Sequence, residues 1–375
     1  MTIPLSLYIH IPWCLSKCPY CDFYSKSIKK KIPEKKYIKN LLLDLKNDIK
    51  LIRSRKIISI FIGGGTPNLI HPNYIKYLIQ EIKKTIQFAK NIEITLEANP
   101  KSVNENVFLK YTEAGINRLS LGIQSFHENL LKNIHRKYSF QELIHTIKYI
   151  KRNKFKNINF DLMYGLPQQK IKESLQDLSY AIKYQPTHIS WYQLSIEKNT
   201  SFGRKKTILP HEKKILLMCK KGQKILKKKK FIQYEISSYA KKKNQCKHNL
   251  NYWNFGDYLG IGCGAHSKIT LKNKKILRIT KNKNIQKFLH GEYIQQQNIV
   301  KKKNIPFEFF LNKFRLNSPC LKKKFIKHTG LKIKYIEKNI QKAIQKKYII
   351  ETNNSWKTTK KGKTFLNNLL QIFIL

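Results

Sequence analysis

Short apolar runs alternate with longer stretches of mixed polarity through the first 240 residues of the chain. The short runs are rich in isoleucine, leucine and aromatic residues, a composition typical of buried strands. This pattern predicts the strands Leu5–Ile11, Ile57–Ile62, Ile92–Glu97, Arg118–Ile123, Asn157–Tyr164, His188–Ile196 and Ile232–Ser237.

The stretches between these strands repeat their apolar positions at helical spacing, which predicts amphipathic helices. The predicted helices are Glu34–Ile52, Pro72–Ala89, Asn104–Ala114, Gln141–Arg152, Ile171–Tyr184 and His211–Lys229. Regular alternation of strand and helix predicts parallel strands joined by helical crossovers. The fold class is therefore α/β, as a barrel or a doubly wound sheet.

From about residue 241 the pattern changes, and we expect three units that cover residues 1–240, 241–303 and 304–375. The middle unit contains His248-Asn249-Leu250-Asn251-Tyr252-Trp253 and Gly260-Ile261-Gly262-Cys263-Gly264-Ala265-His266, followed by a lysine- and asparagine-rich connecting segment.

The last unit is predicted to contain short helices and one hairpin. The helices span Pro306–Phe314, Cys320–Lys327 and Ile333–Gln345, the hairpin spans Tyr348–Thr358 with its turn at Asn353-Asn354, and a final helix follows Gly362. Three helices and a wing resemble a winged-helix module. DNA binding is the alternative for such an outline, but the third helix carries no arginine.

Three cysteines near the N-terminus carry the most specific chemistry. Cys14, Cys18 and Cys21 have the spacing C-x3-C-x2-C directly after the first strand. Three thiolates can hold three irons of a cubane [4Fe–4S] cluster and leave the fourth iron open. A structural zinc site is an alternative, but it requires four ligands. A disulfide pair is another, but nothing in the sequence indicates an oxidising compartment.

Further motifs stand at the ends of successive predicted strands, where barrel enzymes keep their functional residues. They are Gly63-Gly64-Gly65-Thr66-Pro67, Glu97-Ala98-Asn99-Pro100, Gly122-Ile123-Gln124-Ser125-Phe126 and Asp161-Leu162-Met163-Tyr164-Gly165-Leu166-Pro167. With the cysteines, this set resembles the radical S-adenosylmethionine (SAM) superfamily, and most closely its HemN/HemW branch, which handles porphyrins.

That resemblance implies a partial (β/α)6 radical SAM barrel with a C-terminal winged-helix-like module covering it. It also implies a [4Fe–4S] cluster on Cys14, Cys18 and Cys21, with SAM on the open iron. The residues implied as SAM or cluster contacts are Tyr8, Tyr20, Gly64, Gly65, Thr66, Glu97, Gln124, Arg136 and Asp161. Gln124 as an ordinary strand-end residue and Arg136 in a surface ion pair are the structural alternatives.

Two features separate the members of this branch. The oxygen-independent coproporphyrinogen III oxidases continue the motif as C-x3-C-x2-C-x-C, whereas Phe23 stands at the fourth position here. Those oxidases also carry an N-terminal arm, which is not expected here because only thirteen residues precede Cys14. The resemblance therefore favours a haem chaperone, with the oxidase as the alternative function.

A haem carrier needs an axial ligand, an apolar wall and cations near the propionates. His248 is the candidate ligand, and Tyr252 and Trp253 are the candidate wall. Cys263 and His266 are rival ligands, and His248 as a purely structural loop residue is the other interpretation.

The charge of the chain is extreme, at +53, but only eight of its 75 basic residues are arginines. Surfaces that bind phosphate specifically usually contain arginines, because the planar guanidinium can donate two hydrogen bonds to one phosphate. With so few arginines, no specific nucleic-acid partner is expected. The basic surface should instead attract anions in general, including haem propionates and an anionic membrane surface.

A packed globular chain is expected, because 41% of the 375 residues are hydrophobic. No signal peptide is recognised, so a reducing cytoplasm is the expected location, which suits an oxygen-sensitive cluster. The expected partners are an unidentified haem acceptor and an electron donor such as a flavodoxin.

Overall fold

A curved parallel sheet dominates the fold. The computed structural model describes residues 3–102, 105–153 and 155–374. In this part of the chain, six strands follow one another in parallel, each hydrogen-bonded to the next. They are β1 (Leu5–Ile11), β4 (Ile57–Gly64), β5 (Phe88–Ala98), β6 (Arg118–Gln124), β7 (Asn157–Tyr164) and β8 (His188–Gln193).

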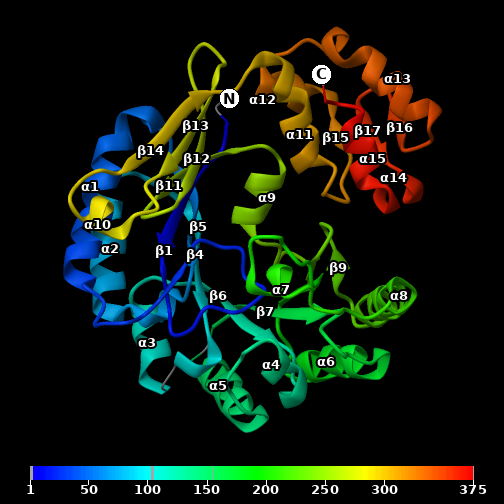
Figure 1. The fold of residues 1–375 in the computed structure, drawn as a ribbon. Coiled ribbons are helices and arrows are strands. Elements are labelled where there is room, and N and C mark those ends of the chain that lie inside the picture. Colours follow the sequence, from blue (N-terminus) through cyan, green and yellow to red (C-terminus); the bar gives the residue numbers. More distant parts are fainter. Residues whose placement is uncertain (1–2, 103–104, 154, 375) are drawn as a thin grey trace.

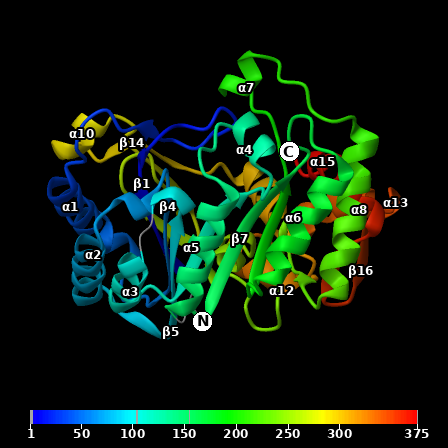
Figure 2. The ribbon, with the colours of Figure 1, turned by 90° about the horizontal axis from the view of Figure 1, so that it is seen from below.

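Helices cover the convex side of this sheet (Figures 1 and 2). They are α1 (Glu34–Ile52), α2 (Pro72–Thr85), α3 (Glu105–Glu113), α4 (Glu128–Asn133), α5 (Phe140–Arg152), α6 (Ile171–Lys183) and α8 (Glu212–Lys228). The short helix α7 (Ser201–Arg204) lies in the connection between β8 and α8. This arrangement confirms the α/β class and the parallel crossovers.

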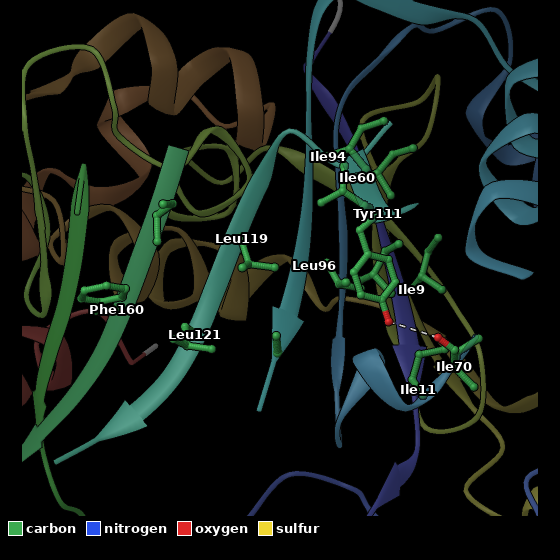
Figure 3. Packing of buried hydrophobic residues seen from close by; sticks show 14 of the residues in the cluster. Ile9, Ile11, Ile60, Ile70, Ile94, Leu96, Tyr111, Leu119, Leu121 and Phe160 are labelled. Atoms are coloured by element: carbon green, nitrogen blue, oxygen red, sulfur yellow. Dashed lines mark hydrogen bonds between the residues drawn. The ribbon is translucent and has the colours of Figure 1, made fainter. Parts of the chain in front are cut away.

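The strands alternate between apolar and polar side chains, and the two sets face opposite ways. The apolar set packs under the helices, and Figure 3 shows part of it on neighbouring strands, including Ile60, Leu96 and Leu119. Tyr111 of α3 joins this core and donates a hydrogen bond of 3.2 Å to the carbonyl of Ile70. The polar set faces the hollow side of the sheet, where the functional residues gather.

The predicted strands and helices of the first 240 residues agree with the structure to within a few residues, apart from the strand predicted at Ile232–Ser237. The helix predicted to reach Ala89 ends at Thr85, because β5 already begins at Phe88. Asn104, the predicted first residue of the following helix, lies outside the described residues.

The strand predicted at Ile232–Ser237 is wrong as a single parallel strand. The structure has β9 (Ile232–Gln233) and β10 (Ser238–Ala240), which pair antiparallel at the sheet edge. Between them Glu235 bridges to Leu316 of the C-terminal region, which interrupts the run.

The segment after residue 240 is more ordered than a connection. It forms the helix α9 (Lys247–Trp253) and the strands β11 (Asp257–Ile261), β12 (His266–Thr270), β13 (Ile276–Lys281) and β14 (Ile294–Ile299), with α10 (Ile285–Leu289) before the last of these. β11 adds to β1 in parallel, and β12 to β14 continue the same sheet antiparallel. The sheet therefore runs across the predicted boundary at residue 240.

Helix α9 lies within the curve of the sheet, as Figure 1 shows, and contacts β1, β4 and β11. A buried ion pair fastens the added strands to the helical layer, since Lys281 Nζ lies 2.5 Å from Asp44 and 2.7 Å from Asp48 of α1.

The C-terminal residues build a separate apolar core. The elements are α11 (Ile305–Lys313), β15 (Cys320–Leu321), α12 (Lys322–Thr329), α13 (Glu337–Gln345), β16 (Ile349–Thr352), β17 (Ser355–Thr358), α14 (Lys360–Thr364) and α15 (Leu366–Gln371). At its centre Phe310 stacks on Phe325 and also contacts the rings of Trp356, edge to face, and Phe373. The three helices and the hairpin follow the predicted order, whereas the division into three domains stays a prediction.

No helix within the described ranges combines the length and the hydropathy that crossing a bilayer requires.

Candidate cofactor site

A cavity of about 420 Å³ opens where the parallel strands end. It collects residues from the loop after β1 and from the ends of β4, β5, β6, β7 and β8. Most of the residues predicted from the sequence line it: Cys14, Cys18, Tyr20, Cys21, Gly64, Gly65, Thr66, Glu97, Gln124, Arg136 and Asp161.

A short parallel pair of strands joins the two ends of the cysteine loop. Cys14 ends the strand β2 (Trp13–Cys14), which pairs with β3 (Lys26–Ser27) on the far side of the loop. Within the loop, the Cys21 amide donates to the Cys18 carbonyl at 3.1 Å. Burial raises the pKa of the Cys14 and Cys21 thiols, so binding of a metal must supply the free energy that deprotonates them.

The described residues offer no group of three or more histidine, cysteine or acidic side chains that could hold a metal ion. A closed zinc site would need a fourth protein ligand beside the three thiols. A cubane cluster makes a different demand, because each thiolate binds a different iron. The thiol donor set, all on one loop beside one cavity, fits that chemistry.

The glycine-rich turn after β4 is packed directly against the cysteine loop. The Gly65 amide donates to the Ile11 carbonyl at 2.7 Å, and the Thr66 amide donates to the Trp13 carbonyl at 2.7 Å. A Cβ added at Gly65 would lie 2.4 Å from the Trp13 carbonyl oxygen and 3.0 Å from Cys14 Sγ. The glycine is therefore required for this close approach, and backbone without side chains faces the cavity there.

Two carboxyl groups stand on the cavity floor. Glu97 Oε2 accepts a 3.1 Å hydrogen bond from the Gly64 amide, and Asp161 accepts 2.8 Å bonds from Ser120 and Asn159. Burial, and then repulsion by Asp161, raise the pKa of Glu97 to about 8. At neutral pH Glu97 is therefore mainly protonated in the chain without ligands.

Arg136 forms another wall, just beyond α4. Its Nη2 donates to the Tyr20 hydroxyl at 3.3 Å, while its buried Nε has no hydrogen-bond partner. A buried guanidinium N–H without an acceptor destabilises the folded chain, and a ligand that accepts a hydrogen bond from it would remove this penalty. The Arg136 side chain is thus suited to a carboxylate and does not form the surface ion pair of the alternative interpretation.

Tyr192 was missed by sequence reasoning. It lines the cavity from β8, and its hydroxyl donates to Gln124 Oε1 at 2.9 Å. Gln124 itself stands in the left-handed region, at φ 65°, where β6 ends. The sequence could have indicated Tyr192, because its position in the alternating pattern of the predicted strand His188–Ile196 places its side chain on the cavity side.

Two predicted contacts lie outside the cavity. Tyr8 is on the inner face of β1, deeper in the barrel, and shares a 3.0 Å hydrogen bond with His10. His248, on α9, is 8% exposed, shares a 3.3 Å hydrogen bond with Ser59 and packs on Phe61. Burial lowers the pKa of His248 to about 3. It lies apart from the cofactor cavity, and its role as a haem ligand stays a prediction.

Replacing Glu97 by glutamine is expected to stabilise the apoprotein at alkaline pH. Because the folded-state pKa is raised, the folded chain binds more protons than the unfolded chain between about pH 4.5 and pH 8. The free energy of unfolding contributed by Glu97 therefore falls as the pH rises through this window. Urea unfolding across the window should show a stability gain for the variant that grows with pH.

The control for this prediction is Glu113→Gln on the exposed side of α3. If the stability gain rose equally steeply with pH in both variants, the pH dependence could not be assigned to Glu97.

The chain matches the family model of the radical SAM superfamily over residues 8–180. It is 54% identical over 371 residues to a Buchnera aphidicola (subsp. Schizaphis graminum) protein named heme chaperone HemW, covering 99% of this chain and 98% of that relative. The protein of the same name from Escherichia coli K12 is 44% identical, with the same coverage of both chains. The chain belongs to the HemW family of radical SAM proteins.

Among solved structures, coproporphyrinogen III oxidase (HemN) from Escherichia coli superimposes on this HemW-family chain with a TM-score of 0.83. The match covers 99% of this chain and 90% of the oxidase at 18% identity, so it establishes the shared fold alone.

Radical SAM membership implies a [4Fe–4S] cluster and SAM as cofactors of this HemW-family chain. The thiols of the cysteine loop, the bare backbone at Gly65 and the unpartnered Arg136 Nε agree with both groups.

Proposed function

We propose that the protein is a haem chaperone, which binds haem and passes it to an acceptor protein. The observation that carries this proposal is the near full-length similarity to relatives named heme chaperone HemW. The exposed Phe23 at the cavity, where the oxidases carry a further cysteine, agrees with it.

In this proposal Cys14, Cys18 and Cys21 hold the [4Fe–4S] cluster, and exchangeable SAM occupies the rest of the cavity. Reduced clusters of this class supply an electron for cleavage of SAM. Gly64, Gly65 and Thr66 present backbone to the methionine end, and Arg136 binds its carboxylate. Tyr20, Gln124, Glu97 and Asp161 hold the remaining polar groups.

The partners follow from the same proposal. They are haem, a haem-acceptor protein and an electron donor such as a flavodoxin. We place this protein in the cytoplasm. Its net charge of +53 favours association with anions, including haem propionates and an anionic membrane surface, and this attraction should weaken as the salt concentration rises.

The experiment begins with anaerobic reconstitution of the cluster in the full chain. Ferric haem is then titrated into one sample, while reductant, SAM and coproporphyrinogen III are added to another. We expect a saturable haem spectrum and no protoporphyrinogen. Turnover of coproporphyrinogen without saturable haem binding would overturn the chaperone proposal in favour of the oxidase.

A further inference from the structure

A second hollow, of about 540 Å³, lies at the opposite end of the barrel from the cysteines. It is lined by α9, α12 and the first residues of β1 and β4. Figure 1 shows α12 beside α11 in the C-terminal part of the chain. Its lining residues are Pro4, Ile58, Lys247, Leu250, Asn251, Asn254, Lys323, Lys324, Lys327 and His328. Its volume falls within the roughly 300–1,000 Å³ of sites for cofactor-sized ligands.

One wall is a single face of α9, since Lys247, Leu250, Asn251 and Asn254 stand at helical spacing. Leu250 contributes apolar surface there, and Pro4 and Ile58 extend it. This side offers an apolar patch, formed by Pro4, Ile58 and Leu250, against which a flat ring can pack.

The α12 wall is cationic. Lys323, Lys324 and Lys327 line it, and no acidic residue is among the described residues that border the hollow. Lys324 Nζ donates to Asn254 Oδ1 at 3.2 Å, which ties this wall to α9. A ligand with two carboxylates on one edge would therefore meet a surface of matching charge.

His328 borders the same hollow and is only 5% exposed. Its Nδ1 lies 3.1 Å from the Phe255 carbonyl oxygen. A carbonyl can only accept, so Nδ1 carries the proton and the lone pair is left on Nε2. Histidines that bind metals are oriented in this way by a backbone carbonyl. Burial lowers the pKa of His328 to about 4, which keeps the ring neutral at physiological pH.

We propose that this hollow is the haem site, with His328 Nε2 as axial ligand of the iron and Lys323 and Lys327 pairing with the propionates. The inference rests on the proposed chaperone function and adds the location of its cargo. It also separates haem from the cluster cavity, because the two sites lie at opposite ends of the strands. His248 then has a structural role on the face of α9 that contacts Ser59.

The test compares haem binding by the full chain with that of His328→Ala. We expect the variant to lose the Soret shift that axial histidine ligation gives to ferric haem, and to bind ferric haem at least tenfold more weakly. Metal-free protoporphyrin IX makes no axial bond, so its affinity should be unchanged. Equal weakening for both porphyrins would overturn the ligand role, because it would show a general collapse of the site.

The second variant avoids the buried histidine. Lys323→Glu/Lys327→Glu reverses two charges on α12 and should weaken both porphyrins several-fold. Lys220→Glu/Lys224→Glu makes the same charge change at the same spacing on exposed α8 and should have little effect. Equal losses in the two pairs would overturn the propionate contacts.

The outcomes also separate this inference from the function it rests on. If the unaltered chain binds haem and both His328→Ala and the α12 pair bind it equally well, the site is wrong and the chaperone proposal survives. If the unaltered chain binds no haem, the chaperone proposal fails, and the site fails with it.

Discussion

Serine at Cys14, Cys18 or Cys21 is expected to reduce the iron content of the reconstituted protein from about four atoms per chain to near zero. Each thiolate binds its own iron, and a neutral hydroxyl is a poor substitute for it. The visible absorption of the cluster should disappear, and the response of that absorption to SAM should disappear with it. Iron and sulfide analysis after anaerobic reconstitution measures the effect directly.

Cys219→Ser is the matched control, because Cys219 is a partly buried free thiol on α8. It should retain the full iron and sulfide content. A Cys18→Ser protein that still assembles a four-iron cluster with normal absorption would contradict the assignment of the three ligands.

Alanine at Arg136 is expected to weaken SAM binding by about tenfold to a hundredfold while leaving the cluster in place. Hydrogen bonds to charged groups contribute about 1.5–3 kcal/mol, and the buried Nε waits for an acceptor in the apoprotein. Calorimetric titration of SAM into the cluster-loaded protein, or the change that SAM causes in the electron paramagnetic resonance of the reduced cluster, measures the loss.

Arg136→Lys tests the geometry separately from the charge. Because lysine keeps the charge but lacks the planar fork, it should recover only part of the affinity. Arg53→Ala, at the exposed end of α1, controls for the loss of one cation from the basic surface. Equal SAM affinity in Arg136→Ala and Arg53→Ala would contradict the proposed carboxylate contact.

Local sequence signals predicted the barrel closely. The strands Leu5–Ile11 and Asn157–Tyr164 and the helix Glu34–Ile52 have the predicted bounds, because each is amphipathic and its apolar face meets one continuous core. Ile232–Ser237 failed because Glu235, in its middle, bridges to Leu316, a residue far along the chain, and leaves only the short antiparallel strands β9 and β10. The strands β12 to β14 were missed because frequent lysine and asparagine hide their alternation.

At the cavity, too, local sequence signals predicted the general location better than the orientation of single side chains. Parallel strands bring their carboxyl ends to one edge, so motifs that follow successive strands had to meet there. This logic placed most of the predicted cofactor contacts around one cavity. Tyr8 and His248 lie outside that cavity, since a motif does not reveal which side of a helix or strand faces the ligand, and their contacts with a cofactor stay predictions.

Short-range patterns in the chain thus specify the fold class, the order of the barrel elements and the cysteine loop, because each depends on residues close in sequence. The unpartnered Nε of Arg136, the buried place of His248 and the pairing of α9 with α12 around His328 depend on residues tens to hundreds of positions apart. Such contacts form only when helices and strands pack together in the tertiary structure, and a local sequence pattern does not specify that packing.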